Sequence, residues 1–453
     1  MQEQSRQRPG QMSLGAVLSP TTAHIAGWRH PDAVSNAGAT FDFYRHAAET
    51  AEAAKLDFVF LADELCAPEA PPELMSLDPL MYRYEPITLT SALAVSTQRI
   101  GIVVTQTTTY NEPYHIARKL ASIDHLSNGR LGWNLVTSYV EAEAKNFNLS
   151  EHARYADRYA RAAEFFEVAA GLWDSWDDDA FVLDKESGRY FDPAKMHQLN
   201  HKGEHFTVAG PLNVRRSPQG RPVLVQAGAS EPGLDLAARL AETTFTAQRT
   251  LESGQAYYRD LKGRMVAYGR SPESLRVIAG VFPIVGGTME EAQRKYDELQ
   301  ELILPQIGLA RLSQLIGFDV TELPLDAPLP DVIPETNSYQ SRQQLIVEMA
   351  RRENLTLREL YLKVVTAYGH RTVVGTPETV ADALEEWWHG HAADGFMVMP
   401  PTLPAGIDDF TAGVVPELRR RGLFRDDYEG DTLRSHLGLE RPERGAPLPP
   451  RRG

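Results

Sequence analysis

Short apolar runs alternate with longer helix-like segments along most of the chain. The apolar runs are nearly continuous and bounded by turn residues, which is typical of strands buried on both faces. They cover residues 12–18, 57–64, 99–109, 130–138, 222–228, 243–247, 275–285 and 394–400. Segments with helical spacing of apolar residues lie between them, at 41–56, 87–97, 114–127, 233–242, 289–303 and 376–390. This alternation predicts an α/β fold with a parallel sheet covered by helices.

The number of predicted strands favours one parallel-sheet architecture. Eight strands indicate a TIM-type (β/α)8 barrel rather than a doubly wound open sheet, and a barrel can absorb 453 residues through insertions. We therefore expect one domain over residues 1–453, with long insertions near 64–86, 174–220 and 304–345. These segments have little helical period, and long irregular segments are usually functional loops or lids. The polar, proline-rich tail 425–453 is expected to extend over the surface or onto a partner subunit.

Charge and cysteine content narrow the functional class. The net charge is −15, from 46 basic and 61 acidic side chains. This balance disfavours nucleic acid and anionic membrane surfaces as partners. The single cysteine, Cys66, cannot form an internal disulfide and suits a reducing compartment. With no apolar run near membrane-spanning length and a polar N-terminal segment, we expect a soluble cytoplasmic protein.

Several common chemistries have no motif in this sequence. It contains no GxxxxGK[ST] phosphate loop, no GxGxxG dinucleotide fingerprint, no HExxH and no GxSxG. The histidines are scattered without the spacing of metal ligands, so we predict no metal site. What remains is a set of polar residues at the predicted carboxyl ends of strands: Asp63, Thr105, Asn134 to Ser138, and Gln226 to Ser230. In a barrel, ligands bind at this end.

Each of these residues also has a structural interpretation. Asp63 can cap the next helix, and Thr105 is a common residue type in strands. Ser230 precedes "EPGLDLAARL" and can be an ordinary helix N-cap, although a helix N-terminus with small residues also binds anions. Asn134 is the most unusual residue, because it lies within the apolar stretch "RLGWNLVTS". A buried amide needs hydrogen-bond partners, so Asn134 suggests a ligand.

Longer motifs resemble a known family. They are "LSNGRLGWNLVTS", "EAKNFNL", "RYADRYARAAEF", "LWDSW" and "PVLVQAGAS". Together they resemble nitrilotriacetate monooxygenase, dibenzothiophene-sulfone monooxygenase and the pristinamycin synthase large subunit, a branch of the bacterial-luciferase-like flavoproteins. The resemblance extends from "GAVLSPTTAHIAGWRHPDA" to "TLRSHLGL" and so covers nearly the whole chain. The segments "DSWDDDAFVLDKESGRYFDPAKMH" and "GPLNVRRSPQG" suggest particular similarity to the sulfone monooxygenases.

The resemblance implies a luciferase-like barrel enzyme with a defined chemistry. It implies reduced FMN (FMNH2) as a diffusible co-substrate, supplied by a separate NAD(P)H:flavin reductase. It implies that O2 is activated through a flavin C4a-(hydro)peroxide, which inserts one oxygen atom into a small organic substrate. A sulfone, another heteroatom-containing compound or a cyclic compound would suit this reaction. The resemblance also implies a homodimer or homotetramer.

The resemblance assigns roles to individual residues. It places flavin contacts at Asp63, Thr105, Asn134, Ser138, Tyr159 and Ser230. Tyr155 stands where relatives often have a histidine, so either Tyr155 or the nearby His152 is expected at the flavin phosphate. The catalytic candidate is His24, at the end of the first predicted strand. Phe60, Trp133 and Phe245 are candidates for an apolar substrate pocket, with core packing as the competing interpretation.

Two alternative functions stay open at this point. One is a luciferase-like oxidoreductase that uses a deazaflavin or flavin without inserting oxygen. The "NLVTS" motif and the 174–220 insertion oppose it. The other is a flavin-binding or storage protein without turnover, which would bind oxidised FMN at least as tightly as reduced FMN.

Overall fold

Eight parallel strands close into a barrel in this computed structural model, which describes residues 8, 10–20, 23–67, 69–138, 140–334 and 340–451. The strands are β1 (Ser13–Val17), β2 (Phe58–Leu61), β3 (Gly101–Thr107), β4 (Leu131–Val136), β7 (Val223–Gln226), β8 (Thr243–Thr246), β9 (Arg276–Val285) and β11 (Gly395–Val398). Strand β9 pairs with both β8 and β11, and β11 pairs with β1, so the sheet has no free edge within the barrel. The predicted TIM-type fold is confirmed.

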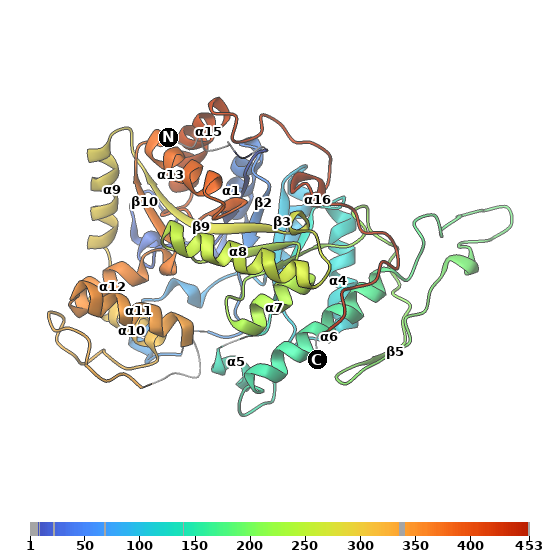
Figure 1. Ribbon diagram of the computed structural model, residues 1–453, viewed down its shortest axis with the longest axis horizontal. Coiled ribbons are helices and arrows are strands. Elements are labelled where there is room, and N and C mark those ends of the chain that lie inside the picture. The colour runs from blue at the N-terminus through green and yellow to red at the C-terminus, as the bar shows by residue number, and fades with distance from the viewer. Residues whose placement is uncertain are drawn as a thin grey trace.

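Helices cover the outside of the barrel (Figure 1). The long ones are α1 (Phe41–Ala53), α3 (Pro86–Ser96), α4 (Pro113–Leu126), α6 (Tyr155–Trp173), α7 (Glu231–Leu240), α8 (Leu251–Ala267), α9 (Met289–Glu301) and α13 (Pro377–His389). Each predicted helix corresponds to one of these. The shorter ones are α2 (Pro72–Met75), α5 (Glu141–Lys145), α14 (Ala405–Asp409), α15 (Val415–Arg420) and α16 (Leu433–His436). Thr376 is the N-cap of α13, since its hydroxyl accepts a hydrogen bond from the Thr379 amide at 3.4 Å.

A tight turn sets the start of strand β4. After α4, Asn128 and Gly129 both adopt left-handed backbone conformations, with φ of 56° and 83°. This geometry is typical of a helix C-terminus and explains the Asn-Gly sequence. The buried Asp124 carboxylate then accepts a hydrogen bond from the Leu131 amide at 3.1 Å. The turn thereby fixes which side chains of β4 face inward.

Side chains of β4 alternate between the helix layer and the barrel interior. Trp133 points outward and packs against Phe165 and Phe166 of α6, with ring centroids 5.9 and 6.1 Å apart. Its indole N–H donates to the Gln106 carbonyl at 3.1 Å. Asn134, the next residue, points inward. Trp133 is therefore part of the core, and the expectation that it lines a substrate pocket does not match its position.

The 304–345 segment is more regular than its proline content suggests. It contains α10 (Pro305–Ile316) and the beginning of α11 (Gln340–Glu353), and α10 packs against both α11 and α12 (Leu357–Val365). These helices share a hydrophobic cluster of their own beside the barrel. The apolar spacing of "PQIGLARLSQLI" encodes α10, but the prolines that follow mask this signal. A ninth parallel strand, β10 (Arg371–Gly375), extends the sheet by pairing with the carboxyl half of β9.

The tail does not merely extend over the surface. Leu433, Leu437 and Leu439 are buried and pack among inward-facing side chains of the barrel strands. A Cβ added at Gly101 would lie 2.5 Å from Leu433 Cδ1, so the strand glycine makes room for this leucine. The buried Arg434 forms an ion pair with Glu242. The tail thus plugs the amino end of the barrel, and the opposite end is left for a ligand.

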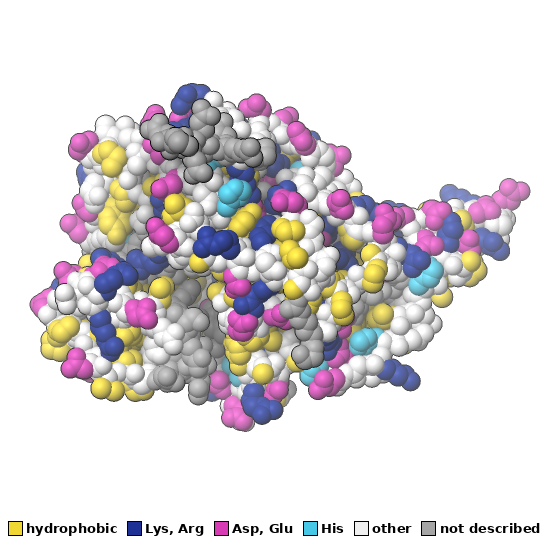
Figure 2. Space-filling model, in the orientation of Figure 1, with side chains coloured by type: hydrophobic (Ala, Val, Ile, Leu, Met, Phe, Trp, Pro, Cys, Tyr) yellow, Lys and Arg dark blue, Asp and Glu magenta, His cyan; other side chains and the backbone are white. Residues whose placement is uncertain are grey.

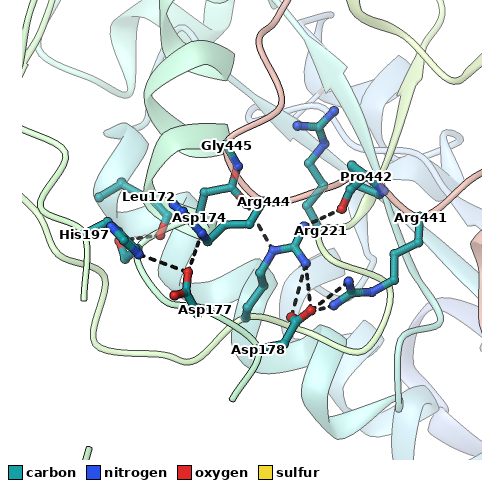
Figure 3. Close-up of polar contacts among 12 residues, drawn as sticks. Leu172, Asp174, Asp177, Asp178, His197, Arg221, Arg441, Pro442, Arg444 and Gly445 are labelled. Atoms are coloured by element: carbon teal, nitrogen blue, oxygen red, sulfur yellow. Dashed lines mark hydrogen bonds and ion pairs between the residues drawn. The ribbon is translucent and has the colours of Figure 1, made fainter. Parts of the chain in front are cut away.

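The 174–220 segment forms an arm that projects from the barrel (Figure 1). It is largely irregular, with two short strands, β5 (His201–Lys202) and β6 (Thr207–Val208). Charged residues at the end of the tail form ion pairs with the base of this arm (Figure 3). Arg441 pairs with Asp178 at 2.7 Å, and Arg444 pairs with Asp177.

The visible face of the molecule carries interspersed acidic and basic side chains, including those on the arm (Figure 2). Of the helices in the described ranges, none combines the length and apolar character needed to cross a membrane.

Candidate functional site

A cavity of about 350 Å³ lies at the carboxyl ends of the barrel strands. Its barrel side is formed by Val17, Phe60, Asp63, Thr105, Asn134, Val136, Ala227, Phe245 and Met399. Its other side comes from outside the barrel strands and includes Leu80, Arg83, Tyr84, Arg311, Gln314, Leu315 and Tyr368. The fold therefore brings together five residues predicted from sequence: Phe60, Asp63, Thr105, Asn134 and Phe245. The predicted insertions 64–86 and 304–345 supply a further part of the lining.

Asn134 is held by a neighbouring strand. The register of β3 and β4 places Thr105 beside Asn134, and the amide nitrogen donates to the Thr105 hydroxyl at 2.9 Å. The side chain is 3% exposed, and no described group lies within hydrogen-bonding distance of its Oδ1 atom. Such an atom costs about 1–3 kcal/mol when it stays unsatisfied. One end of this amide is thus oriented for a ligand in the cavity.

Asp63 lies just beyond strand β2 at the wall of the cavity. Burial raises the pKa of its carboxyl group to about 7, although the guanidinium of Arg83, 4.0 Å away, partly offsets this effect. Nearby Glu85 and Glu143 raise the pKa further. Near neutral pH the carboxyl group can therefore both accept and donate a proton.

A cluster of hydroxyl groups lies at the N-terminus of α7. Ser230 caps this helix and accepts a hydrogen bond from the Gly233 amide at 3.4 Å. Tyr155 donates to the Ser230 hydroxyl, and its ring centroid is 5.1 Å from that of Tyr159. Burial raises the pKa of Tyr155 to about 12, so its hydroxyl stays protonated. A Cβ at Gly228 would lie 3.0 Å from the Tyr159 hydroxyl, so only glycine leaves this approach open.

Of the two alternatives for the phosphate contact, Tyr155 lies beside Ser230. The ring of His152 instead stacks with Tyr110, at a centroid distance of 5.7 Å. Its Nδ1 atom is 2.5 Å from the Tyr110 hydroxyl. The helix N-terminus with its hydroxyls is suited to an anion such as a phosphate.

Ser138 follows strand β4 without lining the cavity. It is buried, and its hydroxyl donates to Thr107 at 2.9 Å. Its backbone is left-handed, with φ of 53°, which is unfavourable for a residue with a Cβ atom. Backbone strain of this kind is often found at functional sites.

His24 is not among the residues that line the cavity. It is buried and stacks on Phe282 with a centroid distance of 6.2 Å, and its Nδ1 accepts a hydrogen bond from the Ala26 amide at 3.2 Å. Burial lowers the pKa of its imidazole to about 4, while a hydrogen bond with Gln300 opposes that shift. The ring is neutral at physiological pH. A second buried histidine, His370, stacks on Phe245 of the cavity wall at 4.9 Å.

Sequence reasoning missed three further cavity residues. Arg83 and Arg311 lie in the segments predicted as insertions, where no periodic pattern marks individual positions. Tyr368 lies just before β10 and has a left-handed backbone, with φ of 49°. The guanidinium of Arg311 lies 5.9 Å from the centre of the Tyr368 ring. The location of Arg83 and Arg311 in the predicted insertions was the available signal, but it did not distinguish the two arginines from their neighbours, and Tyr368 lies outside those insertions.

A closed (β/α)8 barrel with a polar-rimmed cavity at its carboxyl end defines a class of barrel enzymes. Comparison with known proteins identifies the family. The model of the luciferase-like monooxygenases matches residues 21–395. The chain belongs to this family, and it is an oxidoreductase of the monooxygenase type.

The similarity extends over the full length of several relatives. N-acetyl-S-(2-succino)cysteine monooxygenase of Bacillus subtilis is 51% identical, over 95% of this chain and 97% of that protein. Nitrilotriacetate monooxygenase component A of Aminobacter aminovorans is 50% identical, over 97% and 99%. The solved structure of an EDTA monooxygenase from Chelativorans sp. BNC1 has a TM-score of 0.80 at 33% identity, over 95% of this chain and 99% of that chain.

These comparisons confirm the predicted branch and correct one detail. The dibenzothiophene-sulfone monooxygenase of Rhodococcus erythropolis is 40% identical, over 96% of this chain and 98% of that protein. The two proteins named above are 50% and 51% identical. The expectation of particular similarity to the sulfone monooxygenases is therefore wrong. The segments on which it was based lie in the arm and around its base, away from the cavity.

Proposed function

We propose that this protein is the oxygenase component of a two-component monooxygenase that uses reduced FMN and O2. It transfers one oxygen atom to a small organic substrate. A separate NAD(P)H:flavin reductase supplies the reduced flavin by diffusion. The observation that carries this proposal is the unsatisfied amide oxygen of Asn134 in a cavity at the ligand end of the barrel.

The residues present fit a flavin mononucleotide. Asn134, Thr105 and Asp63 offer donors and acceptors for the polar edge of the ring system, and Phe60 and Phe245 offer apolar contact. When bound, the reduced flavin supplies the electrons that activate O2.

The phosphate would bind at the N-terminus of α7. Ser230, Tyr155 and Tyr159 provide hydroxyl groups there, and the helix adds its free amides. Ser138 holds the end of β4 by its bond to Thr107.

The insertions have a physical role in this reaction. Leu80 and Leu315 come from segments outside the barrel and close the apolar side of the cavity. Excluding water limits unproductive loss of reducing equivalents to hydrogen peroxide. His24 follows Ala23 of the cavity lining but does not line the cavity itself, so its role in this scheme is to position that part of the wall.

We further propose a homodimer or homotetramer located in the cytoplasm. The projecting arm supports the oligomer, because it exposes Val182, Leu183 and Tyr190, which are 47%, 52% and 67% exposed. A single cysteine suits a reducing compartment, where reduced pyridine nucleotides are available to the reductase.

An oxidoreductase that does not insert oxygen is not favoured. The relatives reported above, which are 51%, 50% and 40% identical, are named monooxygenases. A solved structure of an F420-dependent alcohol dehydrogenase is only 14% identical and shows the shared fold alone.

Anaerobic titration of the protein with reduced and oxidised FMN tests the proposal. We expect tighter binding of the reduced form and, on admission of O2, oxygen transfer to substrate instead of release of hydrogen peroxide. Equal or tighter binding of oxidised FMN without turnover would indicate a flavin storage protein. If reduced FMN does not bind at all, the proposal is wrong.

A further inference from the structure

We infer that Glu143 is a positioning residue of the proposed flavin site, because its buried carboxyl group ties the loop that carries Asp63 to helix α5, which follows strand β4. This inference rests on the proposed function and deepens it, since Asp63 and Asn134 are both assigned there to the polar edge of the flavin ring. Glu143 does not line the cavity itself. It acts by keeping Asp63 at a fixed position relative to Asn134.

The loop after β2 is held by side chains rather than by its own backbone. Among the residues that the structure describes, no backbone–backbone hydrogen bond involves residues 64–67. Both polar backbone groups of Leu65 are instead bound by α5 and its C-cap. The Glu143 Oε1 atom accepts a hydrogen bond from the Leu65 amide at 3.1 Å. The side-chain amide of Asn146 donates to the Leu65 carbonyl at 2.9 Å.

Glu143 is buried although it is acidic. It is 2% exposed, and its neighbours in the helix, Ala142 and Ala144, are buried as well. Burial raises the pKa of its carboxyl group, and the Ser138 hydroxyl and the Leu65 amide partly offset that shift. Burying a carboxyl group is unfavourable unless hydrogen bonds replace the lost water. The carboxyl group is therefore explained by the backbone amide that it binds and not by packing.

The contacts with the loop come from one of the motifs found in the sequence. The motif "EAKNFNL" begins at Glu143 and includes Lys145 and Asn146. Lys145 pairs with Glu69 of the same loop at 2.8 Å. No flavin contact is assigned to any residue of this motif. Its presence is explained if α5 anchors the loop that carries Asp63.

This anchor links two strand ends that the sheet does not pair. Asp63 follows β2 and Asn134 belongs to β4, whereas β3 lies between these two strands. The hydrogen bond between Glu143 and Leu65 joins the loop after β2 to the helix after β4. A ligand that contacts both Asp63 and Asn134 binds more tightly when their separation is fixed in advance, because less free energy is spent on ordering the site.

The test uses four variants of the full-length protein. Glu143→Leu removes both carboxyl oxygens, whereas Glu143→Gln keeps an acceptor for the Leu65 amide. Asn146→Ala removes the contact with the Leu65 carbonyl from an exposed position. Glu164→Leu is the matched control. Glu164 is also buried and accepts hydrogen bonds from two backbone amides, but these belong to the arm.

Anaerobic titration with reduced FMN and with reduced riboflavin measures the effect. Glu143→Leu should weaken the binding of both flavins about 5- to 10-fold, as expected for the loss of one hydrogen bond that holds a contact group. The ratio of the two affinities should not change, because the loop contacts the ring edge and not the phosphate. Glu143→Gln should bind both flavins within about 2-fold of the wild-type protein, and Asn146→Ala about 3-fold more weakly. Glu164→Leu should lose stability in urea unfolding but keep the wild-type flavin affinity.

A double substitution tests whether Glu143 acts through Asp63. In a protein that carries Asp63→Ala, the further change Glu143→Leu should weaken the binding of reduced FMN by less than about 2-fold, because the group that Glu143 positions is gone. A purely structural role would give the same loss of affinity with and without Asp63.

Several results would overturn the inference. They are wild-type affinity for reduced FMN in folded Glu143→Leu, equal losses in the Leu and Gln variants, and the same loss in the Asp63→Ala protein. A loss of affinity for reduced FMN alone would place Glu143 at the phosphate and would also overturn it. If Glu143→Leu does not fold, wild-type affinity in Asn146→Ala overturns the inference and the expected 3-fold loss supports it. The proposed function survives all of these results and fails only if the wild-type protein does not bind reduced FMN.

Discussion

Replacing Asn134 by Leu separates a ligand contact from a structural contact. Leu has the same number of side-chain heavy atoms and the same branching as Asn, but no polar atoms. The substitution loses the 2.9 Å hydrogen bond to Thr105, a net cost of about 1 kcal/mol. It also removes a buried oxygen without a described partner, which costs the unliganded protein about 1–3 kcal/mol. The free energy of unfolding should therefore stay within about 1 kcal/mol of the wild-type value or rise.

Flavin affinity should change in the opposite direction. A bound flavin would lose its partner at Oδ1 and would keep a buried polar group unsatisfied. We expect reduced FMN to bind about 10- to 100-fold more weakly, which corresponds to roughly 1.4–2.8 kcal/mol. Anaerobic fluorescence titration gives the affinity, and urea unfolding of the unliganded protein gives the stability.

Asn111 provides the matched control at the same end of the barrel. Its amide donates to the Thr107 carbonyl at 2.9 Å, and it does not line the cavity. Asn111→Leu should lower the stability by about 1 kcal/mol and leave flavin binding unchanged. The reasoning about Asn134 is refuted if Asn134→Leu destabilises the protein by more than about 2 kcal/mol while reduced FMN binds normally. That result would show that the amide serves the fold alone.

Four other predictions concern different parts of the molecule. Ser230→Asp should weaken the binding of reduced FMN at least about 10-fold, because the new carboxylate repels the phosphate, and it should have little effect on the binding of reduced riboflavin. Equal losses of affinity for both ligands would contradict a phosphate site. Because the pKa of Asp63 is raised to about 7 in the folded protein, the native state holds a proton that the unfolded state releases, so this group lowers stability as pH rises from about 4 to 7. Asp63→Asn should reduce this fall in the free energy of unfolding by up to about 1.4 kcal/mol per pH unit. If the slope of the free energy of unfolding against pH is the same in the variant and the wild-type protein, the carboxyl group is not buried as described. Leu433→Ala should cost about 3 kcal/mol by calorimetric or chemical unfolding, because the side chain is fully buried in the barrel floor; a change below 1 kcal/mol would show that the tail is not a plug. Leu183→Asp should dissociate the oligomer if the arm forms its interface, and light scattering would then give a lower mass than for the wild-type protein. An unchanged mass would show that the interface lies elsewhere.

The sequence by itself determined the barrel. Its eight buried strands differ in period and composition from the helices between them, and this local signal does not depend on distant contacts. The sequence also indicated a ligand contact at Asn134, because burying an amide in an apolar strand is unfavourable unless the amide has hydrogen-bond partners. The long motifs identified the branch of the family, and they are the basis for proposing a flavin site at the strand ends.

Tertiary structure decided what depends on contacts between distant segments. Trp133 and Asn134 are neighbours in sequence, but the barrel directs one to the helix layer and the other to the cavity. The tail has a polar composition, yet its few leucines fill the space left by the strand glycines. Arg83 and Arg311 are more than two hundred residues apart, in segments without a clear hydrophobic period, and only the folded insertions place both arginines in one cavity. Local hydrophobic patterns determine which helices and strands form. The site also depends on how the loops pack, and loop packing leaves no periodic pattern in the sequence.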